Sequence, residues 1–288
     1  MVDRDLAHHA AAAPVRRLGT TDLAECVRLS EDRGWAPERE KWRLLFEVGD
    51  VYGIDAPDGG LAGAVVATRY GDQTAVISMM LVAQRHERRG LGGRLLRHAL
   101  EHTGTAGFFL HATDFGLPLY ERLGFRTVGR CTSYSGTFDG PAGSGPVRRS
   151  RPATEADLPA IHALDAEVFG APRTGLLDRL PSFCRELRVV EGPGGIAGFG
   201  GAWPNDNNTV IGPVTAQDQD TAVTLVSDLA AAVDGPVRLD IDHRHPELLE
   251  WAGKAGFAAR FSTTVMEHGT PLPADQSRLF VPVMMALG

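Results

Sequence analysis

The sequence has little cysteine and no long apolar run near its start. Its three cysteines, Cys26, Cys131 and Cys184, are far apart in 288 residues. This spacing favours neither a disulfide framework nor a zinc site. The alanine-rich start carries Asp3 and Asp5 and lacks the apolar core of a secretory signal. We therefore expect a cytoplasmic protein with no membrane span and no bound metal.

The sequence also has fewer basic than acidic residues. The chain has 29 Lys and Arg against 36 Asp and Glu, so its formal net charge is −7. This balance disfavours nucleic acid as a partner. A Walker phosphate loop is missing as well, because G-x-x-x-x-G-K-[ST] occurs nowhere in the sequence. Any phosphate-binding element must therefore be of another kind.

One junction in the sequence does suit a phosphate. Residues 75–82 (AVISMMLV) form the apolar run expected of a strand covered on both faces, and residues 91–100 carry apolar side chains at helical spacing. At the start of the second segment, Gly90 and Gly92 allow the backbone to approach a ligand closely. The free N–H groups at a helix start attract an anion.

Three arginines around this junction add charge that pairs with phosphate: Arg85, Arg88 and Arg89. A dinucleotide-binding fold is the alternative interpretation, because Asp114 follows at about the distance of a ribose-binding acid. Against it, Leu95 replaces the third glycine, and several polar residues separate the strand from Gly90.

The junction resembles motif A of the GCN5-related N-acetyltransferases (GNAT), written [RQ]-x-x-G-x-[GA]. Here the motif reads Glu87-Arg88-Arg89-Gly90-Leu91-Gly92, with Val82 eight residues ahead of the first glycine, as in that family. Glu87 stands where Arg or Gln is usual, and Gln84 where Pro is common. The motif acts largely through backbone N–H groups, so these departures leave the resemblance intact.

A second motif of the same family follows at the expected distance. Residues 119–125 (LYERLGF) match motif B, L-Y-x-x-x-G-F. The resemblance implies that Tyr120 lies beside the sulfur of coenzyme A, where a phenol donates a proton to the departing thiolate. It also implies a backbone N–H near Leu81 or Val82 for the developing oxyanion. The implied cofactor contacts are Leu81, Val82, Arg85, Glu87, Arg88, Arg89, Gly90, Leu91, Gly92, Gly93 and Tyr120.

The resemblance implies no particular general base. His111 lies on the strand expected to face the thioester, so it is our candidate base, with Asp114 as the second. The implied activity is acetyl-CoA-dependent N-acyl transfer (EC 2.3.1.-) by direct attack of an amine, carried by a small molecule or a peptide, in a ternary complex. The alternative is a non-catalytic acyl-CoA-binding regulatory module, which has no need of a phenol at Tyr120. The sequence does not identify the acceptor or the preferred acyl chain, and it leaves open whether the protein forms a homodimer.

Landmarks of the first half recur in the second. Val147-Arg148-Arg149 repeats Val15-Arg16-Arg17, and Ala255-Gly256-Phe257 repeats Leu123-Gly124-Phe125, at a common offset of 132 residues. We predict the α/β class, with two tandem GNAT folds, each a mixed, mostly antiparallel sheet flanked by helices. The predicted parts are a disordered tail (1–13), a catalytic domain (14–138), a linker (139–146) and a second GNAT-like domain (147–288).

The second copy lacks the phosphate-binding glycines. The same offset puts Ala222 and Thr224 opposite Gly90 and Gly92. Aspartates precede this segment, and their charge repels a pyrophosphate. Leu249 or Trp251 falls near the position of Tyr120, so the proton donor is missing too. We expect a degenerate copy that shapes the acceptor site.

Overall fold

The computed structural model describes residues 13–138, 140, 149–271 and 274–288. Its first half contains β1 (Val15–Arg17), the 3-10 turn η1 (Thr20–Asp22), α2 (Leu23–Asp32), α3 (Arg39–Val48), β2 (Asp50–Asp55), β3 (Leu61–Tyr70), β4 (Thr74–Val82), η2 (Gln84–His86), α4 (Leu91–Thr103), β5 (Gly107–Ala112), α5 (Leu117–Arg122) and β6 (Arg126–Gly136). The strand predicted over residues 75–82 and the helix predicted over residues 91–100 are confirmed as β4 and α4. The predicted tail and linker lie outside the described residues, apart from Ala13 and Gly140.

The second half repeats this order. It contains β7 (Arg151–Pro152), η3 (Glu155–Asp157), α6 (Leu158–Phe169), α7 (Thr174–Leu177), α8 (Leu180–Phe183), β8 (Glu186–Gly192), β9 (Gly195–Pro204), β10 (Thr209–Ala216), α9 (Gln219–Ala230), β11 (Val237–Asp242), α10 (Pro246–Lys254), β12 (Ala258–Gly269), η4 (Gln276–Arg278) and β13 (Leu279–Val281).

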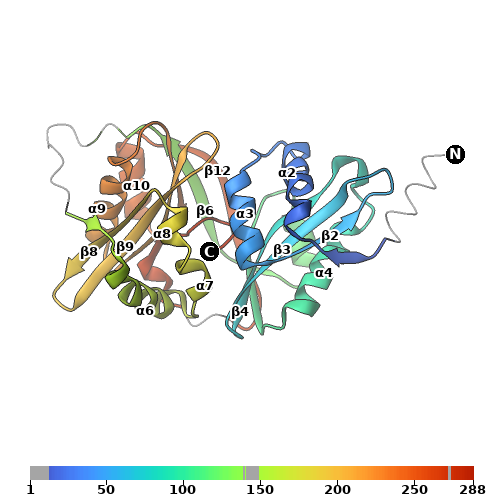
Figure 1. The fold of residues 1–288 in the computed structure, drawn as a ribbon, viewed down its shortest axis with the longest axis horizontal. Coiled ribbons are helices and arrows are strands. Elements are labelled where there is room, and N and C mark those ends of the chain that lie inside the picture. Colours follow the sequence, from blue (N-terminus) through green and yellow to red (C-terminus); the bar gives the residue numbers. More distant parts are fainter. Residues whose placement is uncertain (1–12, 139, 141–148, 272–273) are drawn as a thin grey trace.

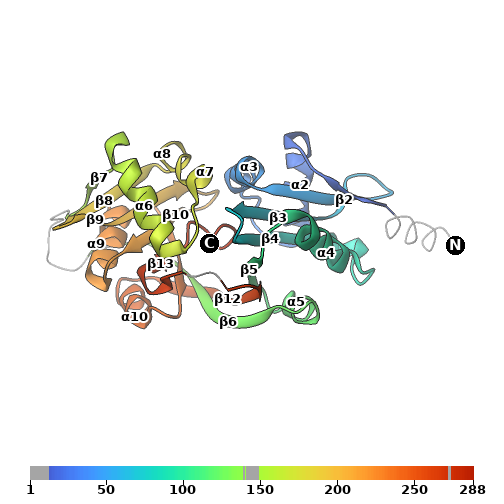
Figure 2. The ribbon, with the colours of Figure 1, turned by 90° about the horizontal axis from the view of Figure 1, so that it is seen from below.

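Among the described residues, all strands form one mixed sheet with the order β1-β2-β3-β4-β5-β12-β6-β11-β10-β9-β8-β7, and β13 pairs with β10. β12 pairs antiparallel with both β5 and β6, and β6 pairs antiparallel with β11. Each half therefore receives the last long strand of the other, and these strands cross between the two lobes (Figures 1 and 2). The predicted α/β class is confirmed, but the two expected sheets are joined into one.

Helices cover the sheet within each half, where β3, β4, β9 and β10 are mostly buried, whereas the exchanged strands β6 and β12 at its centre are partly exposed. In β3, every residue except Arg69 is buried. α4 packs on β3 from one side, and α2 and α3 contact it as well (Figure 2). One apolar cluster spans both halves, because it contains Trp42 of α3 together with Phe199 and Trp203 of β9. The two halves thus share part of their core.

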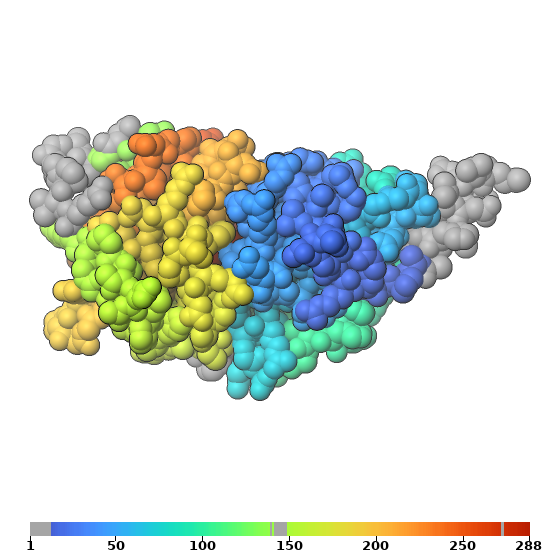
Figure 3. Space-filling model, viewed as in Figure 1, coloured from blue at the N-terminus to red at the C-terminus, as the bar shows by residue number. Residues whose placement is uncertain are grey.

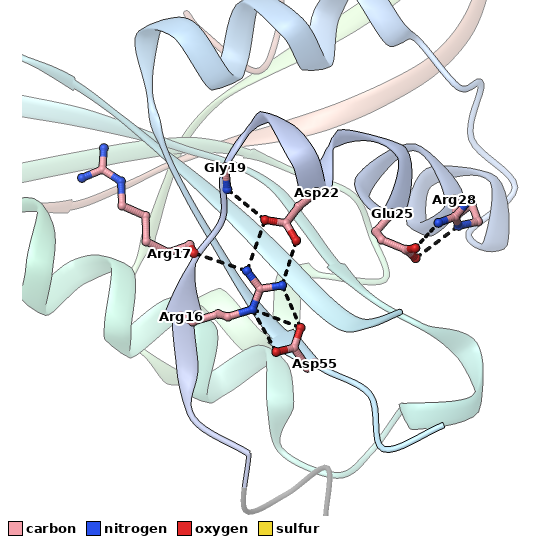
Figure 4. A network of polar contacts seen from close by, with 7 residues as sticks. All are labelled: Arg16, Arg17, Gly19, Asp22, Glu25, Arg28 and Asp55. Carbon is pink, nitrogen blue, oxygen red and sulfur yellow. Dashed lines mark hydrogen bonds and ion pairs between the residues drawn. The ribbon is translucent and has the colours of Figure 1, made fainter. Parts of the chain in front are cut away.

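An arginine network pins the first strand of each half to the helix that follows. In the first half, Arg16 pairs with Asp22 at 2.8 Å and with Asp55 at 2.9 Å (Figure 4). Asp22 also accepts a hydrogen bond from the backbone N–H of Gly19 at 2.9 Å. The guanidinium of Arg16 is the main cause that lowers the pKa of the Asp22 carboxyl.

The second half contains the same network, and it corrects the predicted alignment. Arg151 pairs with Asp157 at 2.7 Å and with Glu191 at 2.8 Å, and Asp157 accepts from the backbone N–H of Thr154 at 2.7 Å. The equivalent of Arg16 is therefore Arg151, and not Arg148 as the offset of 132 indicated. Loops of unequal length change the offset along the chain, so a single value does not align the two copies.

The final residues of the chain lie at the junction of the halves, where the C-terminal label stands in Figure 1. The carbonyl of Val283 accepts from Nε1 of Trp203 at 3.0 Å, and the carbonyl of Leu287 accepts from the Tyr70 hydroxyl at 2.8 Å. On the face shown in Figure 3, which is that of Figure 1, segments of both halves are in direct contact. No helix in the described part of the chain is long and apolar enough to cross a membrane.

Candidate functional site

A split in the sheet creates the site. β4 and β5 run parallel and pair only at their beginnings, where residues 74–76 lie opposite residues 107–109. Beyond Val76 the two strands separate. On its other side, β4 has an irregular register against β3, in which Val66 is paired with Ser78 and Ala64 with Leu81. Met79, inside this bulge, has a φ of 45°. A bulge bends a strand, and here it increases the separation.

α4 begins at the mouth of this split. Its N-cap is Gly90, whose φ is 77°, and no side chain caps the helix there. A Cβ built on Gly90 meets nothing within 4 Å, whereas one on Gly92 comes within 3.2 Å of the side chain of Leu119. The helix therefore presents uncapped N–H groups to open space. These features fit a pyrophosphate bound at a helix N-terminus.

A cavity of about 850 Å³ fills the split, and we call it the cofactor cavity. Most of the predicted cofactor residues line it: Leu81, Val82, Glu87, Arg88, Gly90, Leu91, Gly92, Gly93 and Tyr120. Residues that the sequence did not single out also line it, among them Arg33, Trp35, Phe115 and Arg122. Its volume is in the range of small-molecule sites.

Two of the predicted contacts point elsewhere. Arg85 lies outside the lining of the cofactor cavity and pairs with Asp58, in the turn between β2 and β3, at 2.9 Å. Arg89 is also outside this lining and lies 3.3 Å from Nδ1 of His86. The sequence showed the positive charge but could not show the local partners that hold these side chains away. Asp114, the second candidate base, is exposed and outside the lining as well.

Glu87, the departure from motif A, is neutralised within the cavity wall. Its carboxylate forms an ion pair with Arg33, which follows α2. The Arg33 guanidinium also lies over the ring of Phe115, 5.0 Å from the centroid. Arg33 thus connects the segments after α2, β4 and β5 around one wall. Because Glu87 has a cationic partner, its charge opposes an anionic ligand less strongly.

Tyr120 lies in the wall of the cofactor cavity on α5. Its side chain is largely buried, and its ring meets Phe125 edge-on, with centroids 5.8 Å apart. Burial raises the pKa of the phenol well above its usual value of 10. The hydroxyl therefore keeps its proton at neutral pH and is available as a donor.

His111 lies on β5 and lines the cofactor cavity. Burial is the main cause that lowers the pKa of its imidazole to about 4, so the ring is neutral at pH 7. Nδ1 lies 3.2 Å from Oγ1 of Thr263, on β12 of the second half. The hydroxyl of Thr263 in turn donates to Sδ of Met285 at 3.6 Å. His111 is therefore positioned by residues from the other half of the chain.

A second cavity, of about 410 Å³, adjoins the first at the junction of the halves, and we call it the junction cavity. Both cavities are lined by Trp35, Ile77, Ser78, Met79, His111 and Thr113. The second half adds Arg238, Phe261, Thr263, Met285 and Ala286. His111 therefore stands where two cavities meet.

The corresponding split of the second half is closed. β10 and β11 also run parallel and pair only over residues 209–211 and 237–239. Just past this point, β13 pairs with β10 at Val214 and Thr215 and lies against β11. Phe280 and Val281 of β13 belong to the apolar core of this half. A strand thus occupies the space that remains a cavity between β4 and β5.

The helix that follows β10 is also different. α9 begins at Gln219, and its N-cap is Asp218, whose side chain accepts from the backbone N–H of Thr221 at 2.8 Å. The residue equivalent to Gly90 is therefore Asp218, whereas the sequence alone predicted Ala222.

The second half also lacks an equivalent of the Tyr120 hydroxyl. The backbone N–H of Phe125 donates to the carbonyl of Tyr120, and the backbone N–H of Phe257 donates to the carbonyl of Ala252, both at 3.0 Å. The equivalent of Tyr120 is thus Ala252, which has no hydroxyl.

Comparison with known proteins identifies the fold and the family. Family models described as the acetyltransferase (GNAT) domain match residues 49–127 and residues 161–281, which together are more than two thirds of the chain. The chain is therefore a tandem GNAT protein, with two GNAT domains, and it belongs to the GNAT N-acetyltransferase family. The predicted tandem arrangement is confirmed, and the family implies acetyl-CoA as co-substrate.

Several proteins are similar to the chain over nearly its whole length. YitH of Bacillus subtilis, described as an uncharacterized N-acetyltransferase, is 28% identical over 94% of this chain and 97% of its own length. A crystal structure from Pyrococcus horikoshii, provisionally described as an acetyltransferase, superposes with a TM-score of 0.81 at 20% identity, covering 96% of this chain and 95% of that one. A tandem GNAT protein from the clavulanic acid biosynthesis pathway has a TM-score of 0.64 at 12% identity, covering 90% and 99%. These structural likenesses concern the fold alone.

Proposed function

We propose that the first half binds acetyl-CoA in the cofactor cavity and transfers the acetyl group to a primary amine that enters through the junction cavity. The observation that carries this proposal is that the two cavities meet at His111, in the split between β4 and β5. A cofactor arm and an acceptor can then approach the same point from different sides. The reaction is an N-acyl transfer (EC 2.3.1.-) by direct attack in a ternary complex.

The start of α4 holds the pyrophosphate in this proposal. Backbone N–H groups of Leu91, Gly92 and Gly93 donate to it, and the exposed Arg88 and Arg122 in the cavity lining add positive charge. At the end of β4, a backbone N–H of Leu81 or Val82 stabilises the negative charge that develops on the thioester oxygen.

His111 acts as the base. Because the Thr263 hydroxyl donates to Met285, its oxygen is left to accept from Nδ1–H of His111. This arrangement supports the tautomer in which Nε2 keeps its lone pair. The lowered pKa keeps the ring neutral, so Nε2 has a free lone pair at neutral pH, although it is a weaker base than an ordinary imidazole. Thr263 is a positioning residue in this scheme.

Tyr120 acts as the acid. The amine nitrogen attacks the acetyl carbonyl carbon, a C–N bond forms and the C–S bond breaks. The proton of the amine passes to Nε2 of His111, and the Tyr120 hydroxyl protonates the departing thiolate. The products are the amide and coenzyme A, and transfer of the histidine proton to the phenolate through solvent restores both groups.

We further propose that the second half binds no coenzyme A and serves the acceptor side. Three observations support this: β13 occupies the split between β10 and β11, the Asp218 carboxylate caps α9, and Ala252 replaces the phenol. A carboxylate at the helix start competes for the same N–H groups as a phosphate and repels it.

Tyr120→Phe tests the proposal. With an amine acceptor and acetyl-CoA, followed by thiol release, we expect kcat to fall by on the order of 10²–10⁴-fold, the usual contribution of a positioned acid, while the Kd for acetyl-CoA is unchanged. The ring remains, so packing is preserved.

Tyr70→Phe is the matched control. It removes another buried hydroxyl, which donates to Leu287, and should lower stability by about 1 kcal/mol without changing kcat. If Tyr120→Phe turns over like the parent while chemistry limits the rate, Tyr120 is not the acid, and the non-catalytic acyl-CoA-binding module becomes the better interpretation.

A further inference from the structure

Large exposed apolar side chains gather at the two cavities. Among the described residues, those exposed beyond about a third are Trp35 (39%), Phe115 (74%), Phe261 (47%) and Val128 (46%). The three aromatic ones all line a cavity: Phe115 the cofactor cavity, Phe261 the junction cavity and Trp35 both. Exposed apolar groups that gather around a concave site mark a surface that binds a ligand.

The junction cavity is walled by aromatic rings and thioethers. Phe261 comes from β12, Met285 from the final segment, Met79 from the bulge of β4 and Trp35 from the loop after α2. Thioethers adapt to the shape of a ligand and pack well against aromatic rings. Aromatic side chains prefer offset or edge-on contact with another ring. This wall therefore suits a planar apolar group.

The charged groups in the lining already have partners. The Glu38 carboxylate is paired with Lys41 and, at 3.4 Å, with Arg238. Arg238 is also paired with Asp240 at 2.9 Å, and its guanidinium lies 5.5 Å from the centroid of the Phe261 ring. The negative charges of Glu38 and Asp240 thus equal the positive charges of Lys41 and Arg238. A ligand with several charges would have to break these pairs, whereas an uncharged body would not.

We propose that the acceptor is a primary arylalkylamine. Its aromatic body lies in the junction cavity against Phe261, Met285 and Trp35, and its short chain carries the amine to His111. This inference rests on the proposed function, because it takes the junction cavity as the acceptor entrance. The second half thereby determines the substrate, since Phe261 and Met285 both belong to it.

A substrate panel tests this. 2-Phenylethylamine and tryptamine are compared with spermidine and glucosamine by acetyl-CoA-dependent thiol release, and acetyl-CoA binding is measured separately by calorimetry. We expect kcat/KM for the arylalkylamines to exceed that of the other two by 10-fold or more. If spermidine or glucosamine is acetylated as well or better, the arylalkylamine inference is wrong but the proposed function stands. If acetyl-CoA binds and no amine in the panel is acetylated, the inference is also wrong; if acetyl-CoA does not bind, the proposed function fails.

Phe261→Ala locates the aromatic body. Loss of the ring should raise KM for the arylalkylamine by on the order of 10-fold, with kcat and the Kd for acetyl-CoA little changed. Val128→Ala is the matched control, because Val128 is similarly exposed, on β6, but lies outside both cavity linings. A KM for Phe261→Ala equal to that of the parent, in a variant with the same urea midpoint, would remove Phe261 from the acceptor site.

Discussion

The split between β4 and β5 and the split between β10 and β11 begin in the same way and end differently. In each, two parallel strands pair over three residues and then separate. In the first half the space beyond is a cavity of about 850 Å³. In the second half β13 enters it and pairs with β10. The same architecture therefore gives a cavity in one copy and a filled core in the other.

The difference extends to the helix beside each split. At the start of α4, Gly90 leaves the N–H groups uncapped, whereas at the start of α9 the Asp218 side chain satisfies one of them. A helix start with Gly at the N-cap is less stable than one capped by Asp by only about a few tenths of a kcal/mol. The first half thus gives up local stability at the position where we propose that the pyrophosphate binds.

The largest expected effect on this comparison comes from Gly90→Asp. A carboxylate at the open helix start would repel the pyrophosphate and fill its place, so we expect acetyl-CoA binding to be lost in calorimetry. The parent should bind one acetyl-CoA per chain and the variant none. A variant that binds acetyl-CoA within a few-fold of the parent would mean that the pyrophosphate does not bind at the start of α4.

Gly104→Asp is the matched control for that experiment. Gly104 ends the same helix, has a φ of 70° and, like Gly90, has nothing within 4 Å of a built Cβ. Both substitutions therefore carry a similar backbone strain at opposite ends of α4. We expect Gly104→Asp to bind acetyl-CoA within a few-fold of the parent. Equal losses in both variants would mean that strain, and not the phosphate position, explains the effect of Gly90→Asp.

Local patterns predicted the first half well. The apolar run of β4, Gly90 and Gly92 at the start of α4, and the place of Tyr120 on α5 each depend on short stretches of sequence. The exchange of β6 and β12 was not predicted, because strand order depends on contacts between distant segments. For the same reason the sequence did not indicate that Phe261 and Met285 line a cavity with His111.

The misplaced residues have a similar physical explanation. Ala222 was aligned with Gly90 because a single offset was applied, but only residues 217–218 separate β10 from α9, whereas residues 83–90 separate β4 from α4. Arg85 was assigned to the phosphate because of its charge, and only the fold brings it to Asp58. Composition near a motif predicts that a charge is present but not which partner it meets.

The next difference between the two splits is His111. It lies on β5 four residues beyond the first residue paired with β4, and Ile241 occupies the same position on β11 relative to β10. The pKa of His111 is lowered to about 4, so below its unfolded value of about 6.5 the unfolded chain binds a proton that the folded chain does not. Stability is therefore lost as the pH falls from 6.5 towards 4, by up to about 3 kcal/mol. His111→Gln should show a shallower loss in urea unfolding across this range. Parallel curves for the two proteins would mean that His111 is not held neutral by the fold.

The smallest expected effect concerns Asp218. Its bond to the backbone N–H of Thr221 is the main cause that lowers the pKa of this carboxyl, and it caps α9. Asp218→Ala should reduce the free energy of unfolding by about 1 kcal/mol, measured in urea at pH 7, where the carboxylate is charged. Asp218→Asn keeps an oxygen acceptor and should retain most of the stability. Neither variant should change the acetyl-CoA stoichiometry, because β13 still fills the split beside α9. A second bound acetyl-CoA in Asp218→Ala would show that the cap alone, and not the inserted strand, closes the second site.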